Sequence, residues 1–405
     1  MSAGKFDLNT FISQKVTKRH ESLFKEDLES SQKKLSDFIN DSSFLVIGGA
    51  GSIGSAYIKA LLKFKPAKLV VVDKNENSLA ELIRDLRSST AYNIPDELYL
   101  YPFNYASESF ARLIKQSNAF DLIANFAAHK HVRSEKDDLS IQAMLENNVF
   151  NLATLLDQLK EKSPKVFFSV SSDKATNPAN IMGASKKLME KLMFAYTDSF
   201  KVRSARFANV AFSDGSLLYA FLKRIEKSQP LVSPNDVRRY FVSPDESGQL
   251  CLLASIVPEG NSVCFPKLNS NDMMKFSDIA LSLLNELDFQ PMICSSESES
   301  RDKAKTEIDK GRYPIFLFES NTSGEKMFEE FYKQDELPDL EKYSKLGTID
   351  MKGTQNVNAL NTTIKKLKTL FKSNIIDKKT IVQLIKQEVP GFDHVETGFN
   401  LDQKM

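Results

Sequence analysis

Cysteine is scarce in this 405-residue sequence, which has only Cys251, Cys264 and Cys294. They are far apart, and no pair has the Cys-x-x-Cys or Cys/His spacing of a redox motif or a zinc site. An odd number of scattered cysteines does not predict the disulfide framework of a secreted domain. We therefore expect three reduced, structural thiols and a cytoplasmic location.

Long hydrophobic runs and an excess of charge of one sign are also absent. No uninterrupted apolar run approaches the roughly 18 residues needed to span a bilayer, and the first residues lack the apolar core of a signal peptide. The formal net charge of +1 gives no support for nucleic acid or an anionic membrane as a partner. We expect a protein that neither inserts into a membrane nor binds nucleic acid.

Short apolar runs alternate with helical patterns through the first half of the chain. The runs span residues 44–47, 69–72, 122–124 and 166–170. The helical patterns between them span residues 55–64, 77–88, 107–116 and 140–161. Buried strands that alternate with helices predict a parallel sheet with helices on both faces. The expected fold class is therefore α/β, with a doubly wound Rossmann sheet whose ligands bind at the carboxyl ends of the strands.

A glycine-rich turn follows the first apolar run and precedes a helical pattern. Gly48, Gly51 and Gly54 have Gly-x-x-Gly-x-x-Gly spacing. Glycines let the backbone approach a pyrophosphate closely, and the first amides of the helix, at Ser52 and Ile53, would face the phosphates. The strand before the turn and the helix after it make this a dinucleotide-binding signal rather than a chance glycine triplet.

Residues at the next strand ends predict where the rest of the dinucleotide lies. Asp73 ends the second run, where a carboxylate binds both ribose hydroxyls and repels a 2′-phosphate, so NAD is favoured over NADP. Asn104 and Tyr105 are expected near the adenine. Ala127 and Ala128, after the third run, are expected to line the nicotinamide.

The chain divides into four parts by composition and pattern. Residues 1–42 are expected to form a helical N-terminal arm, and residues 43–212 the NAD-binding Rossmann domain. In residues 213–344 the alternation weakens, which predicts a smaller C-terminal substrate lobe mixed with the Rossmann core. Residues 345–405 are Lys-rich and are expected to form a helical C-terminal extension. The two terminal segments favour a homo-oligomer.

A hydroxyl, an acid and two amines gather in residues 172–186. Ser172, Asp173 and Lys174 follow the fourth apolar run, and Lys186 comes four positions after Met182. Short-chain dehydrogenases place a Ser or Thr and a Tyr-x-x-x-Lys pair around a nicotinamide, but methionine cannot accept a proton. The centre is therefore built for a nicotinamide and lacks the usual base, which argues against plain alcohol oxidation.

Simpler interpretations of two motifs stay open. Asp173 and Lys174 would pair with each other if they only stabilised a turn at the strand end. His129 and His131 flank Lys130, and this cation and the lack of further ligands argue against a metal site. We predict no metal there, and we expect the loop to position a phosphate or the next loop.

Seven segments with motifs of one enzyme family run through residues 44–335: Gly48–Gly54, Ala127–Val132, Ser172–Lys186, Arg206–Val210, Ser213–Ser216, Arg238–Phe241 and Gly324–Glu330. Together they resemble the extended short-chain dehydrogenase/reductases. Within that family they are similar to the polysaccharide-biosynthesis type of UDP-N-acetylglucosamine 4,6-dehydratase, a lyase. Some members of this dehydratase family also have methionine at the position of Met182, and those members resemble the branch that retains the configuration at C5.

The resemblance implies a reaction cycle and a role for each catalytic residue. NAD takes the C4 hydride of the sugar, the C5 proton and the C6 hydroxyl leave, and the hydride returns to C6. Ser172 would bind the C4 hydroxyl and help to deprotonate it. Asp173 would protonate the departing C6 oxygen, and Lys174 would remove the C5 proton, for which it must be uncharged. Lys186 would bind the nicotinamide ribose.

The resemblance also implies contacts to the UDP-sugar. Lys130 and His131 are expected at a phosphate. The other expected contacts are Asn209, Ser213 and Ser216 at the diphosphate, Arg239 and Tyr240 at a phosphate or the uracil, and Glu330 at the uridine ribose.

Two other functions remain open from the sequence. A C4 epimerase on the same UDP-amino sugar needs a base but not the acid–amine pair, so Asp173 and Lys174 without a tyrosine at position 182 disfavour it. A catalytically inactive NAD-binding scaffold would explain Met182, whereas Ser172 and Lys186 speak against it.

Overall fold

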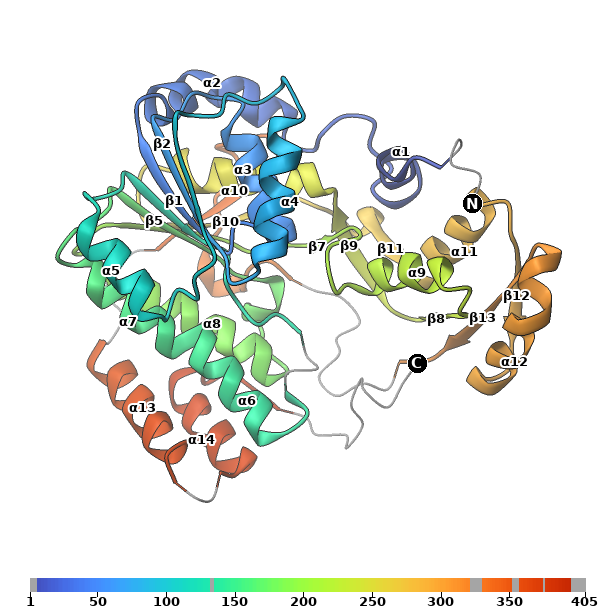
Figure 1. The fold of residues 1–405 in the computed structure, drawn as a ribbon. Helices are drawn as coiled ribbons and strands as arrows, with labels where there is room; N and C mark the ends of the chain where they lie inside the picture. Colours follow the sequence, from blue (N-terminus) through green and yellow to red (C-terminus); the bar gives the residue numbers. More distant parts are fainter. Residues whose placement is uncertain (1–5, 132–134, 321–329, 352–356, 374–375, 395–405) are drawn as a thin grey trace.

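The computed structural model describes residues 6–131, 135–320, 330–351, 357–373 and 376–394 (Figure 1). Among these residues, eight strands form one large sheet. From one edge to the other, the strands are β14 (Leu346–Asp350), β10 (Ser262–Pro266), β6 (Lys201–Ala205), β5 (Val166–Val170), β4 (Leu122–Asn125), β1 (Ser43–Ile47), β2 (Lys68–Val72) and β3 (Glu97–Tyr101).

All neighbouring strands of this sheet are parallel except β10 and β14, which are antiparallel. The central strands are buried on both faces, which is why their sequences are continuous apolar runs rather than alternating ones. The chain order reverses beside β1, between β4 and β2, and a doubly wound sheet binds its ligands at such a point. The predicted α/β fold class is confirmed.

Helices cover both faces of the large sheet (Figure 1). One face carries α3 (Ser52–Leu61), α4 (Glu76–Arg87), α10 (Pro244–Ile256) and α2 (Lys25–Ile39). The other carries α5 (Glu108–Gln116), α7 (Asn151–Leu159) and α8 (Ile181–Phe194). The helix α6 (Asp138–Leu145) continues through a π-helical turn, Glu146–Phe150, into α7.

A smaller lobe lies beside the large one (Figure 1). It contains a parallel sheet of β12 (Gln290–Cys294), β13 (Arg312–Phe318) and β8 (Leu231–Pro234). A second small sheet consists of β11 (Met273–Lys275), β9 (Arg238–Val242) and β7 (Asn209–Val210). The helices of this lobe are α9 (Leu217–Glu226), α11 (Phe276–Glu286) and α12 (Glu297–Glu307). Residues of α9, α11, β8 and β13 form a hydrophobic core separate from that of the large lobe.

The N-terminal arm joins the two lobes. Its first helix, α1 (Leu8–Phe11), and the π-helical turn after it pack into the core of the smaller lobe. Further along, Arg19 forms an ion pair of 2.7 Å with Glu246 of α10 and donates a hydrogen bond to the Phe241 carbonyl of β9. The helix α2 then packs on α10.

The C-terminal extension differs from the expected helical segment at its start. Residues 346–350 form β14, which pairs with β10 and adds an antiparallel edge strand to the large sheet. A Cβ on Gly347 would lie 2.3 Å from the Phe265 ring, so the glycine lets β14 lie close to β10. The pairing satisfies backbone groups of β10 that would otherwise form a bare sheet edge. Of the described residues that follow, those of α13 (Val357–Leu370) and α14 (Lys378–Glu388) are helical. Phe371, directly after α13, contacts the Phe150 ring, and Glu388 of α14 forms an ion pair with Lys191 of α8.

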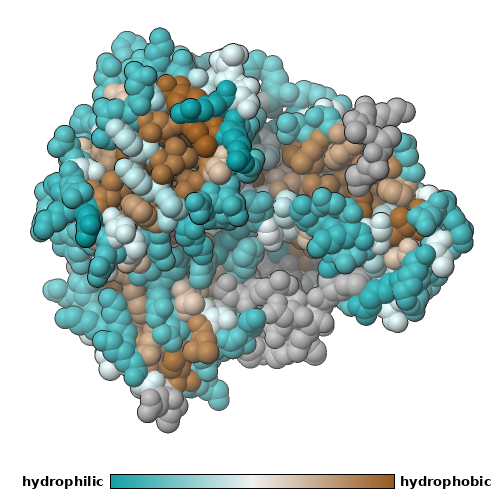
Figure 2. Space-filling view, in the orientation of Figure 1, coloured by the Kyte–Doolittle hydropathy of each residue, from teal (hydrophilic) through white to brown (hydrophobic). Residues whose placement is uncertain are grey.

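Hydrophilic residues cover most of the face in Figure 2. Hydrophobic residues gather over the upper part of the large lobe, beside α1, and around α13 and α14 (Figure 2). None of the helices in the described residues combines the length and the apolar character that crossing a membrane would require.

Candidate active site

The loop between β1 and α3 requires glycine at two positions. Gly48 has a φ of +72°, and a Cβ on it would lie 2.7 Å from the Ala127 amide nitrogen. A Cβ on Gly54 would lie 2.3 Å from the Gly48 carbonyl oxygen. Gly51 is exposed, and α3 begins directly after it at Ser52, with the unpaired amides of its first turn at the loop. A tightly turned backbone before a helix N-terminus fits the pyrophosphate of a dinucleotide.

Asp73, at the end of β2, is fixed against this loop. Its Oδ2 accepts a hydrogen bond from the Ala50 amide (3.1 Å), and its Oδ1 accepts one from the Asn75 amide (3.0 Å). The carboxylate therefore stands beside the glycine loop at the carboxyl end of β2. This is the position from which an acid reaches a ribose in a doubly wound fold.

The other side chains expected at the dinucleotide differ in accessibility. Asn104 is exposed after β3. Tyr105 is buried, and its hydroxyl donates to the Asn147 carbonyl, so its side chain points into the large lobe. Ile53 packs partly against the core of that lobe, which leaves its backbone amide as the group that a phosphate would meet. Of the two residues expected near the adenine, Asn104 alone has an exposed side chain.

Ala127 and Ala128 follow β4 and lie beside the glycine loop. The Ala127 amide donates to Oδ1 of the buried Asn125 (3.0 Å). The backbone of His129 is held at both ends by Asn148, whose Oδ1 accepts from its amide (2.8 Å) and whose Nδ2 donates to its carbonyl (2.9 Å). Asn148 lies in the π-helical turn between α6 and α7, and such turns often occur at functional sites. These bonds fix the wall expected at a nicotinamide.

A turn of the smaller lobe contacts both of these loops. The Asp214 carboxylate accepts a hydrogen bond from Ser52 Oγ (2.9 Å), and the Asp214 amide donates to the same oxygen (2.9 Å). Lys130 Nζ donates to the Asp214 carbonyl (2.9 Å). A Cβ on Gly215 would lie 2.9 Å from the His131 ring. Within the described residues, no three His, Cys, Asp or Glu side chains gather as a metal ion would require.

The acid and the amine after β5 contact each other. Ser172 Oγ donates to Asp173 Oδ1 (2.7 Å), and Lys174 Nζ lies 3.2 Å from the same carboxylate oxygen. The Asp173 side chain is 4% exposed and that of Lys174 is 24% exposed. The structure therefore contains the direct pair that the sequence left open, and it adds the serine hydroxyl to it. One buried carboxylate oxygen links all three groups.

The helix α8 begins against this turn. A Cβ on Gly183 would lie 2.6 Å from the Lys174 carbonyl oxygen, so α8 approaches the Asp173–Ala175 turn very closely. Met182 and Lys186 are both buried on α8. Lys186 Nζ donates to the Val170 carbonyl (3.4 Å).

Burial lowers the pKa of Lys186 to about 8. The Glu190 carboxylate raises this pKa and the Lys130 ammonium lowers it, but both effects are smaller than that of burial. A lysine with a pKa near neutrality can lose its proton at the pH of the cell, which is typical of groups at functional sites.

The residues expected at the nucleotide sugar lie on several segments, some of which are joined by hydrogen bonds. Asn209 Nδ2 donates to the Tyr240 carbonyl (3.3 Å), which joins β7 to β9. Arg239 is buried. Asn177 Nδ2 donates to Glu330 Oε2 (2.8 Å), and Asn177 comes three residues after Lys174. Val132 and Gly324–Glu329 lie outside the described residues.

Sequence reasoning missed a buried ionic cluster that includes two residues of α8. It consists of Glu190, Arg206, Lys187 and Glu336. Arg206 belongs to a motif that the sequence singled out, but its partners could not be identified because Glu336 is 130 residues away. The one available signal was the position of Glu190, four residues and thus one helical turn after Lys186.

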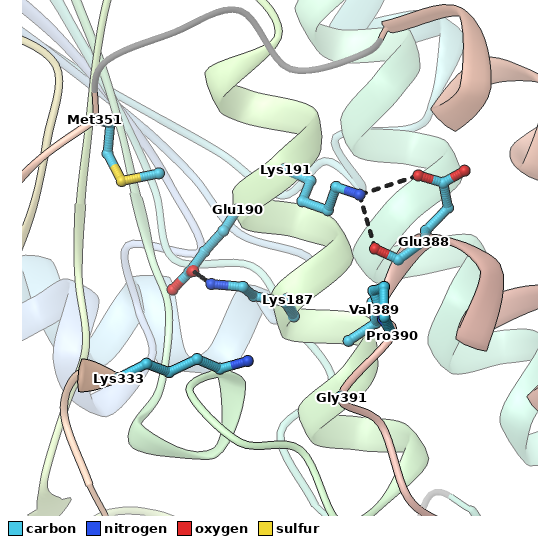
Figure 3. Close-up of a pocket in the computed structure, with 9 residues that line it drawn as sticks. All are labelled: Lys187, Glu190, Lys191, Lys333, Met351, Glu388, Val389, Pro390 and Gly391. Carbon is cyan, nitrogen blue, oxygen red and sulfur yellow. Dashed lines mark hydrogen bonds and ion pairs between the residues drawn. The ribbon is translucent and has the colours of Figure 1, made fainter. Parts of the chain in front are cut away.

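A pocket of about 230 Å³ lies next to this cluster. Figure 3 shows it between α8, Lys333 and the chain after α14, with Lys191 bonded to Glu388 and Lys187 to Glu190. None of the residues predicted for catalysis or binding lines it. The pocket marks the junction of α8 with the C-terminal extension, and the strand ends at Ser172 remain the candidate active site.

The polysaccharide biosynthesis protein family matches residues 44–350, which run from β1 to β14. The chain belongs to this family. The match confirms the resemblance that the seven motifs predicted.

Two relatives match more than half of the chain. The capsular polysaccharide biosynthesis protein CapD of Staphylococcus aureus is 27% identical over 336 residues, which are 81% of this chain and 51% of CapD. The UDP-N-acetylglucosamine 4,6-dehydratase (inverting) of Campylobacter jejuni is 27% identical over 256 residues, 61% of this chain and 72% of that enzyme. The chain therefore spans about half the length of CapD.

A solved structure shares the fold. The X-ray structure of Pen from Bacillus thuringiensis matches with a TM-score of 0.63 and 21% identity, over 78% of this chain and 90% of that one. The match covers nearly all of Pen, so the two proteins share one overall architecture.

Proposed function

We propose that this chain is a nucleotide-sugar 4,6-dehydratase that uses NAD and acts on UDP-N-acetylglucosamine. The observation that carries the proposal is the linked set of Ser172, Asp173 and Lys174, beside α8, where Met182 replaces a tyrosine base. A dehydratase must remove a C5 proton and expel the C6 hydroxyl, and an amine beside an acid supplies both functions. The name of the relative from Campylobacter jejuni supports the same reaction.

The chain's residues fit the cofactor. NAD, when bound, would supply the acceptor for the C4 hydride and the donor that returns it to C6. The loop of Gly48–Gly54 would hold the pyrophosphate, Asp73 the adenosine ribose, and Lys186 the nicotinamide ribose. An acid at position 73 favours a free 2′-hydroxyl, so we propose NAD rather than NADP.

The three linked side chains can accept or donate each proton that moves during the cycle. Lys174, when uncharged, takes the C5 proton and later returns it to C5. Asp173, when protonated, gives its proton to the departing C6 oxygen, which leaves as water. The proton lost by the C4 hydroxyl reaches Asp173 through Ser172, whose Oγ is bonded to the carboxylate at 2.7 Å. The overall change is the loss of one water, and Asp173 does the work of the missing tyrosine through the serine.

The same arrangement supports retention at C5. Lys174 would return the proton to the face from which it took it, and retention is also what Met182 predicts. The Campylobacter jejuni relative is named as inverting, so the two proteins would differ in this step. The configuration at C5 of the product, read from NMR coupling constants, tests this part of the proposal.

The deciding experiment is incubation of the protein with NAD and UDP-N-acetylglucosamine that carries deuterium at C4. A dehydratase gives a 4-keto-6-deoxy sugar lighter by one water, with the deuterium at C6. Recovery of the galacto isomer would assign a C4 epimerase instead. Unchanged substrate, with NAD bound, would assign an inactive scaffold.

A further inference from the structure

Arg206, directly after β6, is fully buried between two carboxylates. Its Nε and Nη2 donate to Glu190 at 2.9 and 2.8 Å, and its Nη1 and Nη2 donate to Glu336 at 2.6 and 2.7 Å. Nη1 also donates to the Phe331 carbonyl (2.8 Å). Lys187 Nζ lies 3.1 Å from both Glu190 and Glu336, so two cations meet two anions. The cluster is balanced in charge.

The two carboxylates lie on different segments, Glu190 on α8 and Glu336 at the end of residues 330–336. Glu190 is on α8, one turn after Lys186, and accepts a hydrogen bond from Ser171 Oγ (2.6 Å) next to Ser172. Glu336 ends a segment of residues 330–336 that leads towards β14. Arg206 therefore ties the helix of the candidate catalytic residues to a segment more than a hundred residues away.

The other end of residues 330–336 lies at the candidate active site. Glu330 accepts a hydrogen bond from Asn177, and the Phe331 ring is 5.6 Å from the ring of Tyr240. Both Glu330 and Tyr240 are expected to contact the uridine half of the substrate. The segment thus joins the expected uridine contacts, at one end, to the buried cluster at the other.

We propose that Glu336 is a positioning residue for nucleotide binding. By bonding Arg206 and Lys187, it holds residues 330–336 against α8, so that Glu330 and Tyr240 stand where the uridine half of the sugar nucleotide binds. This role rests on the proposed function for its substrate class, but it concerns binding of the nucleotide and not the chemical step. A displaced segment would weaken uridine binding and leave Asp173 and Lys174 in place.

The charges around Glu336 agree with this role. Burial raises its pKa, but the bonds from Arg206 and the charge of Lys187 outweigh burial and lower the pKa to about 2. Glu336 is therefore ionised at neutral pH. A neutral amide at this position would keep the shape but leave Arg206 and Lys187 with one carboxylate between them.

The test compares Glu336→Gln with the unaltered protein by titration with UDP and, separately, with NAD. We expect the Kd for UDP to rise about tenfold and the Kd for NAD to stay unchanged, because residues 330–336 include an expected uridine contact, Glu330, and none of the residues expected to bind NAD. In turnover, the KM for UDP-N-acetylglucosamine should rise and kcat should hold, which is the signature of lost binding rather than lost chemistry. Glu226→Gln, which breaks an exposed pair with Lys223, is the matched control and should change neither Kd.

Glu336→Asp is the second variant, because it keeps the charge and shortens the side chain by one methylene. It should recover part of the affinity for UDP, and it covers the case in which Glu336→Gln fails to fold. The proposal is overturned if folded variants lose thermal stability while the Kd for UDP and the KM stay unchanged, or if the Kd for NAD rises equally. If the unaltered protein binds UDP and the variants weaken it, but no sugar nucleotide is dehydrated, then the positioning role holds and the proposed reaction fails.

Discussion

The two sides of the candidate active site are assembled over very different distances along the chain. On the cofactor side, Asp73 accepts a hydrogen bond from the amide of Ala50, 23 residues earlier, and Gly54 packs against the carbonyl of Gly48 in the same loop. On the substrate side, Asn177 meets Glu330 across 153 residues. The glycine loop and Asp73 thus lie within one strand–helix–strand unit, residues 43–73. The substrate side exists only when distant parts of the chain fold onto α8.

This difference predicts that the two sides respond separately to substitution. Changes on the substrate side should alter turnover or nucleotide binding while NAD stays bound. Changes on the cofactor side should alter NAD binding first. The predictions below test that separation, from the largest expected effect to the smallest.

The largest effect is expected from Lys174→Ala. It removes the amine that lies 3.2 Å from Asp173 and should lower kcat for dehydration about 10²- to 10⁴-fold, the usual contribution of a general base. The Kd for NAD, measured by fluorescence titration, should not change. Lys223→Ala, which removes an exposed lysine on α9, is the control and should keep full turnover. Normal dehydration by Lys174→Ala would exclude this lysine as the base.

Lys186 should make stability depend on pH. Its pKa is about 8 in the folded protein and returns to about 10.5 on unfolding, so between these values the unfolded chain binds more protons. The free energy of unfolding therefore gains about 3 kcal/mol from this residue as pH rises through that range.

Lys186→Met, which removes the titrating amine, isolates that contribution. Urea unfolding of the cofactor-free proteins at about pH 7.5 and about pH 9.5 should show the unaltered protein gaining about 2 kcal/mol relative to the variant. An equal pH dependence in both proteins would mean that the buried amine keeps its ordinary pKa.

Gly54→Ala should damage the cofactor side alone. The added methyl would lie 2.3 Å from the Gly48 carbonyl, which cannot move without opening the loop. Overpacking of this kind costs about 1–3 kcal/mol, and we expect both stability and NAD affinity to fall. Gly260→Ala is the control, because a Cβ there would have no atom within 4 Å. Unchanged NAD affinity in folded Gly54→Ala protein would contradict the assignment of this loop.

The smallest effect is expected from Asp214→Asn, at the contact between the two sides. The exposed carboxylate is bonded to Ser52 at the start of α3, where a helix favours bound anions. Removing its charge should tighten NAD binding about two- to fivefold, as measured by isothermal titration. Weaker binding would mean that the bond to Ser52 orders the loop more than its charge repels the pyrophosphate.

Most of the fold and one side of the site could be predicted from sequence because their signals are local. Apolar runs identified the central strands, and glycine spacing identified the loop after β1. The helical prediction failed for residues 346–350, since a strand of five residues forms there only because the edge of β10 needs a partner. Tyr105 showed the same limit, because nothing local reveals that its hydroxyl turns inward to Asn147.

The sequence by itself determined which chemical groups are available: a glycine-rich turn, an acid and an amine beside a serine, and a lysine four positions after the methionine that replaces a tyrosine. Only the tertiary structure decided that Asp173 holds both Ser172 and Lys174, and that Arg206 lies between Glu190 and Glu336. The physical reason is that motifs encode local backbone geometry and chemistry. The pairing of buried charges depends instead on which distant segments pack together, because a charge leaves water only when the fold provides its partner.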